Sequence, residues 1–105
     1  MKLMIDEASV VGVYSSDLNL QSAMHNHSVE IRLTGNVTAL TVNVEGSLSG
    51  NHWGLLASHI LSSSEISNKG ALFHIESKLV EKIRVRIINY SGTGTVSIWY
   101  TPYPN

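Results

Sequence analysis

The clearest metal-like pattern in the sequence is a pair of histidines one residue apart, His25 and His27. On a strand, residues i and i+2 point to the same face, so two imidazoles at this spacing can bind one metal ion. A zinc site needs further ligands, which His52, His59 or His74 would have to supply, because the chain contains no cysteine. Two histidines in a polar segment are more commonly exposed to solvent, so we expect neither a bound metal nor another cofactor.

Patterns that are typical of catalytic sites are weak. The sequence has no Gly-x-Ser-x-Gly nucleophile elbow. Glu30 and Glu45 could supply the paired carboxylates of a glycosidase, but both alternate with apolar residues and are expected on outer, solvated faces. The Gly-rich segment 91–94 (SGTG) precedes a strand pattern, whereas a phosphate-binding loop needs a helix behind its glycines. We therefore expect no catalytic residues and no enzymatic activity.

Aromatic residues give the best binding signal. Trp53 follows Asn51 and His52 after a turn, and an exposed indole beside polar groups suits stacking on a sugar. The alternative is that Trp53 closes one end of the core. Trp99 alternates with apolar neighbours and should lie on an outer face, where an apolar side chain indicates contact with another chain. Tyr103, close to the C-terminus, is a second candidate for such a contact.

The elements that would position these residues are strands, because apolar and polar residues alternate along much of the chain. Segment 82–100 gives the strongest pattern and predicts one β-hairpin that turns at 89–94. Segment 18–27 is ambiguous between a helical turn and an irregular loop. The other predicted strands lie at 9–14, 28–33, 40–48, 53–58 and 71–75. The fold class predicted is all-β, a single antiparallel β-sandwich of about eight short strands, jelly-roll-like or Greek-key.

Length and composition agree with one domain spanning 1–105. Residues are 43% hydrophobic and only 14% charged, which suits a sandwich with hydroxyl-rich outer faces. We expect short arms at both ends, 1–8 and 101–105, because the prolines of the C-terminal segment cannot continue a sheet. Leu3 and Ile5 in the first arm would then be available to reach a neighbouring molecule.

Charge argues against a nucleic-acid partner, and the absence of a long apolar run argues against a membrane partner. Seven Lys and Arg against eight Asp and Glu give a net charge of −1, so there is no general attraction to nucleic acid. A local basic stripe at Lys82, Arg84 and Arg86 is expected to be a solvated strand face. No apolar run approaches the roughly 20 residues of a membrane span, and acidic residues come too early for a secretion signal. We expect no nucleic-acid partner, no membrane partner and assembly in a host cytoplasm.

Two segments resemble known proteins. Segment 44–56 (VEGSLSGNHWGLL) resembles a Gly-rich turn followed by Trp that occurs in discoidin-type carbohydrate-binding modules and in short structural proteins of tailed bacteriophages. Segment 82–100 (KIRVRIINYSGTGTVSIWY) is similar to the closing segment of the same phage proteins. The resemblance implies a small β-sandwich that coats the capsid or forms part of the head or tail surface.

The resulting functional expectation is a non-enzymatic structural protein of a phage-like virion, with a capsid decoration or minor head protein preferred. It would contact copies of itself, in trimers or other rings, and a major capsid or tail protein. The expected interface residues are Leu3, Ile5, Trp99 and Tyr103. The alternative is a carbohydrate-binding module or a receptor-binding tail-associated domain, which would bind a glycan through Asn51, His52 and Trp53.

Overall fold

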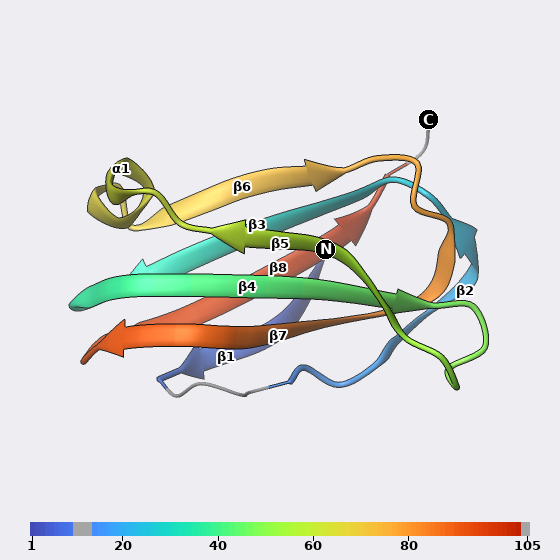
Figure 1. The fold of residues 1–105 in the computed structure, drawn as a ribbon, viewed down its shortest axis with the longest axis horizontal. Coiled ribbons are helices and arrows are strands. Elements are labelled where there is room, and N and C mark those ends of the chain that lie inside the picture. Colours follow the sequence, from blue (N-terminus) through green and yellow to red (C-terminus); the bar gives the residue numbers. More distant parts are fainter. Residues whose placement is uncertain (10–13, 104–105) are drawn as a thin grey trace.

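The computed structural model describes residues 1–9 and 14–103 and places eight strands in two antiparallel four-stranded sheets (Figure 1). We call the sheet with order β1-β8-β3-β6 sheet A and the sheet with order β2-β7-β4-β5 sheet B. Each sheet contains strands from both halves of the chain, and the predicted all-β fold, an antiparallel β-sandwich of about eight strands, is confirmed. Sheet A comprises β1 (Lys2–Ala8), β8 (Thr95–Pro102), β3 (His27–Thr34) and β6 (Gly70–Ile75); sheet B comprises β2 (Leu18–Met24), β7 (Val80–Gly92), β4 (Val37–Ser47) and β5 (Gly54–Ile60).

The core lies between the sheets and follows the alternation seen in the sequence. Strands place successive side chains on opposite faces, so every second residue of a half-buried strand points inward. Ile83, Val85 and Ile87 of β7 are fully buried, as are Val96 and Ile98 of β8. The polar residues between them lie on the outer faces of the two sheets.

The prediction that segment 82–100 forms one hairpin is wrong, although both of the predicted strands exist. β7 belongs to sheet B and β8 to sheet A, and the two-residue connection Thr93–Gly94 crosses from one sheet to the other. The N–H groups of Thr93 and Gly94 donate to the carbonyl of Asn36 at 2.7 and 2.8 Å, and Asn36 lies in the neighbouring crossover between β3 and β4. A Cβ on Gly94 would lie 2.1 Å from the carbonyl oxygen of Thr34. Gly94 therefore allows two crossovers to pack closely together and does not form a hairpin turn.

The expected N-terminal arm 1–8 is also wrong. This segment forms β1, the edge strand of sheet A, which pairs with β8 through a register interrupted by bulges. Lys2 and Leu3 lie opposite Tyr100 and Trp99, and Ile5 lies opposite Ile98. The strand is paired along one side, so it is part of the sandwich.

The C-terminal segment 101–105 is in the sheet as far as Pro102, which lies opposite His27 of β3. Proline is tolerated there because the β1 pairing ends at Tyr100, which leaves a neighbouring strand on one side only. The N–H of Tyr103 then donates to the carbonyl of Asn26 at 3.0 Å. The rest of the expected arm, 104–105, lies outside the described residues.

Segment 18–24 forms the strand β2, so both alternatives expected for it, a helical turn and an irregular loop, are wrong. β2 is mostly exposed because it is the edge strand beside β7, and this exposure explains its weak pattern. Of the strand expected at 9–14, positions 10–13 lie outside the described residues. Tyr14 forms an isolated antiparallel bridge with Arg86 of β7.

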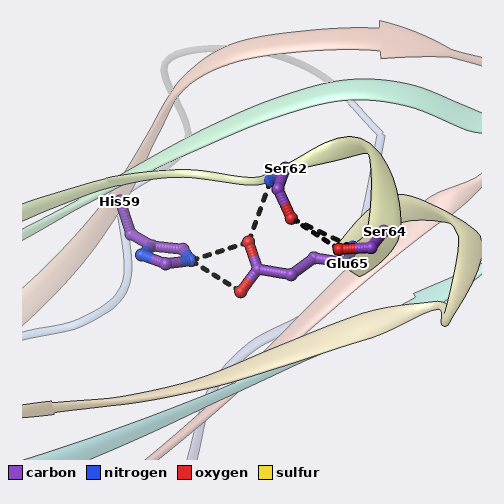
Figure 2. A network of polar contacts seen from close by, with 4 residues as sticks. All are labelled: His59, Ser62, Ser64 and Glu65. Atoms are coloured by element: carbon purple, nitrogen blue, oxygen red, sulfur yellow. Dashed lines mark hydrogen bonds and ion pairs between the residues drawn. The ribbon is translucent and has the colours of Figure 1, made fainter.

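The short helix α1 (Ser63–Ser67) follows β5 and is held by a capping box (Figure 2). The N–H of Glu65 donates to the Ser62 hydroxyl at 3.2 Å, and the N–H of Ser62 donates to the Glu65 carboxylate at 2.9 Å. His59 Nε2 lies 3.1 Å from both oxygens of that carboxylate. The N–H of Ser62 stabilises the charged form, which lowers the pKa of Glu65. Within the described part of the chain, no helix is both long and apolar enough to cross a membrane.

Candidate functional site

The outer face of sheet A carries a row of four side chains, one from each strand, of which three are apolar and the one on β3 is acidic. The strand register places Leu3 of β1 opposite Trp99 of β8, Trp99 opposite Glu30 of β3, and Glu30 opposite Leu72 of β6. Leu3 is 38% exposed and Leu72 is 60% exposed, while Trp99 is half-buried. We call these four residues the apolar row. Large apolar side chains aligned across a solvated face are typical of a surface that contacts another molecule.

Charged and small residues form the next row of the same face. Ser97 of β8 lies opposite Arg32 of β3, and Arg32 lies opposite Gly70 of β6. The Arg32 guanidinium carbon is 4.9 Å from the centroid of the Trp99 ring, a cation–π contact that links the two rows. We call Ser97, Arg32 and Gly70 the small row. The two rows together place one acid, one base and one indole at the middle of the face.

A depression of about 80 Å³ lies in this face. Ligand pockets for small molecules are typically about 300–1,000 Å³, so this depression is too small to enclose one. A space of this size suits a side chain from another protein surface. Its lining residues are Met1, Ser28, Glu30, Leu72, Trp99, Tyr100 and Thr101.

Tyr103 lies beside this face and not on a free arm. Its ring meets His74 of β6 edge-on, with ring centroids 5.9 Å apart. His74 Nδ1 in turn lies 2.8 Å from the hydroxyl of Ser28, which lines both the central depression and a second one beside Tyr103. Tyr103 is therefore continuous with the apolar row, and it remains a candidate contact residue together with Leu3 and Trp99.

Ile5 is a correction to the expected interface. It is only 5% exposed and belongs to the core, because β1 is a strand whose inner face turns Ile5 toward sheet B. Leu72 is a residue that sequence reasoning missed. The sequence contains no clear signal for it, because Ala71, Leu72 and Phe73 are all apolar, but in the structure Ala71 and Phe73 pack against the core. A residue between two inward positions must point outward.

Trp53, the centre of the alternative ligand site, lies against the outer face of sheet B. The Arg84 guanidinium carbon is 4.2 Å from the Trp53 ring centroid and 4.6 Å from that of Tyr14. Arg84 Nε also donates to the Glu45 carboxylate at 2.6 Å, which fixes the guanidinium between the rings. The Trp53 indole N–H donates to the carbonyl of Gly50 at 3.1 Å. One face of the indole is thus occupied by arginine.

Asn51 and His52 are exposed in the loop between β4 and β5. His52 lines an open depression of about 460 Å³, together with apolar residues such as Leu56 and Val80. Neither Asn51 nor Trp53 lines this depression. Of the three residues of the alternative ligand site, this depression is therefore lined by His52 alone.

His27, half of the metal-like pair, is fully buried and hydrogen-bonded at both ring nitrogens. Nε2 lies 2.9 Å from the carbonyl of Lys78 and Nδ1 lies 2.5 Å from the hydroxyl of Tyr100. A carbonyl can only accept, so Nε2 carries the proton and Nδ1 accepts from Tyr100. Burial disfavours the imidazolium and lowers the pKa of His27, and burial also raises that of Tyr100. His27 thus belongs to a buried polar network with Tyr100 and the carbonyl of Lys78. Residues 1–9 and 14–103 contain no group of three side chains that could hold a metal ion.

Comparison with known proteins identifies the fold and no family. No protein-family model matches the chain, and no curated protein sequence matches it. Among solved structures, the SPBc2 prophage-derived protein YomS is similar with a TM-score of 0.56 at 11% identity. That match covers 95% of this chain and 90% of YomS.

Other similar structures are parts of carbohydrate-active proteins. The C-terminal domain of a chitobiase from Bacteroides fragilis has a TM-score of 0.55 at 12% identity, with 84% of this chain and 63% of that one covered. A family 89 glycoside hydrolase from Clostridium perfringens has a TM-score of 0.55 at 15% identity and covers 85% of this chain. This chain spans only 11% of that hydrolase and 19% of a further glycoside hydrolase. At identities this low, the structural similarity shows a shared fold alone.

Proposed function

We propose that the chain is a non-enzymatic structural protein of a phage-like particle, a capsid decoration or minor head protein that coats or stabilises the particle through its sheet A face. The observation that carries the proposal is the apolar row on that face, where Leu72 is 60% exposed and Leu3 is 38% exposed. Exposing such a band to water is unfavourable, so covering it with another protein surface would be favourable.

The form of the site supports contact over catalysis. The face is open and its central depression has a volume of only about 80 Å³, which suits side chains of a facing protein. Trp99 and Arg32 lie at its middle, and these residue types are enriched at the centres of protein interfaces. Similarity over nearly the full length to a prophage-derived protein supports the particle context.

A single thiol tests the proposal, because the chain contains no cysteine. In the variant Leu72→Cys the thiol would lie on the proposed contact face, and in Asn51→Cys it would lie in the exposed loop between β4 and β5. Both variants should react with a maleimide in the free, dilute protein. In native particles Cys at position 72 should be protected, while Cys at position 51 should report whether reagent reaches the assembled chain.

Equal labelling at position 72 in the free protein and in the particle would contradict the proposed face. Absence of the chain from purified particles of its source phage would contradict the structural role itself. These two outcomes are distinct because the first concerns which face makes contact and the second concerns whether the chain is a particle component.

A carbohydrate-binding role is the second candidate, supported by the same sandwich in chains described as glycoside hydrolases and a chitobiase. The residues for it are Asn51, His52 and Trp53. Because Arg84 occupies one face of Trp53, a sugar would have to stack on its other face. Quenching or enhancement of tryptophan fluorescence by a glycan, lost in Trp53→Ala and kept in Trp99→Ala, would favour this role. A glycan screen with no response would remove it.

A further inference from the structure

We propose that the partner of the sheet A face is a second copy of the same face, related by a twofold axis that runs across the strands between the apolar row and the small row. This inference rests on the proposed function, since it names the partner of the contact face. A twofold contact requires a surface that is complementary to itself. The pairing register of sheet A shows which residues of the two copies such an axis would bring together.

Charge is the first element of self-complementarity. Glu30 and Arg32 are two residues apart on β3 and share the outer face, one in each row. A twofold axis between the rows would place Glu30 of one copy against Arg32 of the other, and the reverse contact would form at the same time. Both charges lie near Trp99, where covering by a partner would reduce solvent screening.

Side-chain size is the second element. The same axis would place Trp99 against the second copy's Ser97, and Leu72 against the second copy's Gly70. Two large side chains of the apolar row, Trp99 and Leu72, would therefore each meet a small residue of the small row. Two sheets stacked this way keep their strand directions within about 30° of each other, as aligned sheet packing requires.

The size of the face predicts a weak pair. Four strands about 4.8 Å apart and roughly seven residues long at about 3.3 Å per residue offer a flat area of roughly 450 Å². Stable complexes bury about 800 Å² on each partner. The free chain should therefore associate only at high concentration, and the high local concentration within an assembly would favour pairing.

Charge reversal provides a test that separates contacts between copies from contacts within one chain. The variants Glu30→Arg and Arg32→Glu each place like charges opposite each other in a self-pair. Both symmetric contacts change sign in every pair, so each variant alone should associate roughly tenfold more weakly than wild type or worse. An equal mixture of the two variants should restore association, because each copy then presents the charges that the other lacks. Sedimentation velocity over a concentration series reaching hundreds of micromolar measures all three.

The double variant E30R/R32E is the matched control. It keeps the net charge of the face and should associate with itself, yet it should exclude wild-type chains, because like charges would then face each other. It also keeps the test informative if a single variant fails to fold, which circular dichroism would reveal. Labelled double variant and unlabelled wild type, sedimented together, measure this exclusion.

The outcomes separate this inference from the proposed function. If the mixture fails to restore association, or the double variant pairs freely with wild type, the twofold register is wrong. If wild type remains monomeric throughout the concentration series, pairing between copies is overturned, while protection of Cys at position 72 in particles would still support contact with a different protein. Loss of that protection would overturn the proposed contact face, and absence of the chain from purified particles would overturn the proposed structural role.

Discussion

Removing the hydroxyl of Tyr100 should destabilise the fold through His27. The Tyr100 hydroxyl donates to His27 Nδ1, and both side chains are buried. The variant Tyr100→Phe keeps the ring but leaves the imidazole with a buried acceptor that has lost its donor. A buried polar group without a partner costs about 1–3 kcal/mol, so we expect a loss of about 2 kcal/mol in the free energy of unfolding. For a domain of this size, that loss lowers Tm by roughly 8–16 °C.

Urea unfolding followed by circular dichroism measures this change directly. Tyr103→Phe is the matched control, because Tyr103 is half-buried at the edge of sheet A and its change should stay within about 0.5 kcal/mol. Nitrogen-15 NMR of wild type should show His27 protonated at Nε2, since the carbonyl of Lys78 can only accept. Equal unfolding midpoints for wild type and Tyr100→Phe, or an imidazole protonated at Nδ1, would refute the reasoning.

Three further changes test the fold. Burial lowers the pKa of His27 from 6.5, so the unfolded chain binds the proton more readily than the folded chain. The free energy of unfolding should therefore fall below pH 6.5, by at most about 1.4 kcal/mol per pH unit. His27→Gln should flatten this slope, and equal slopes for the variant and wild type would contradict the buried neutral state. Gly94→Ala should lower Tm strongly, because its Cβ would lie 2.1 Å from the carbonyl oxygen of Thr34, whereas Gly54→Ala, with nothing within 4 Å, should be nearly neutral; similar midpoints would contradict the packed crossover. Ser62→Ala removes the N-cap of α1 and should cost about 1 kcal/mol by urea unfolding, a value that a merely exposed serine would not produce.

The core of the sandwich could be predicted from the sequence because alternation alone decides which side of a strand is buried. Val29, Ile31 and Leu33 on β3 and Leu40, Val42 and Val44 on β4 are buried as their spacing predicts. The outward position of Trp99 follows from the same rule. Local spacing therefore predicted these two strands and one of the central residues of the candidate contact face.

Strand partners could not be predicted, because local spacing contains no information about which sheet a strand enters. A Gly-rich turn between two alternating runs is equally compatible with a hairpin and with a crossover between sheets. The difference lies in Gly94, which packs against the backbone of the β3–β4 crossover far away in the sequence. Ile5 was misjudged for a similar reason, because its burial depends on pairing with a strand more than ninety residues later.

The candidate contact face depends on the same long-range pairing. Leu3, Trp99 and Leu72 come from the beginning, the end and the middle of the chain, and only the register of sheet A aligns them. The capping box at Ser62–Glu65, in contrast, is local, and its Ser-x-x-Glu pattern is a helix-start signature that our sequence predictions missed. Sequence reasoning therefore reaches individual outward residues but not the surface that they form together.

A density map of the chain within its native particle would show directly what covers the outer face of sheet A. We expect another protein surface over Trp99 and Leu72, with Arg32 facing an acidic side chain across the contact. A map in which these side chains face open solvent, while a different face of the sandwich holds the chain in place, would contradict it.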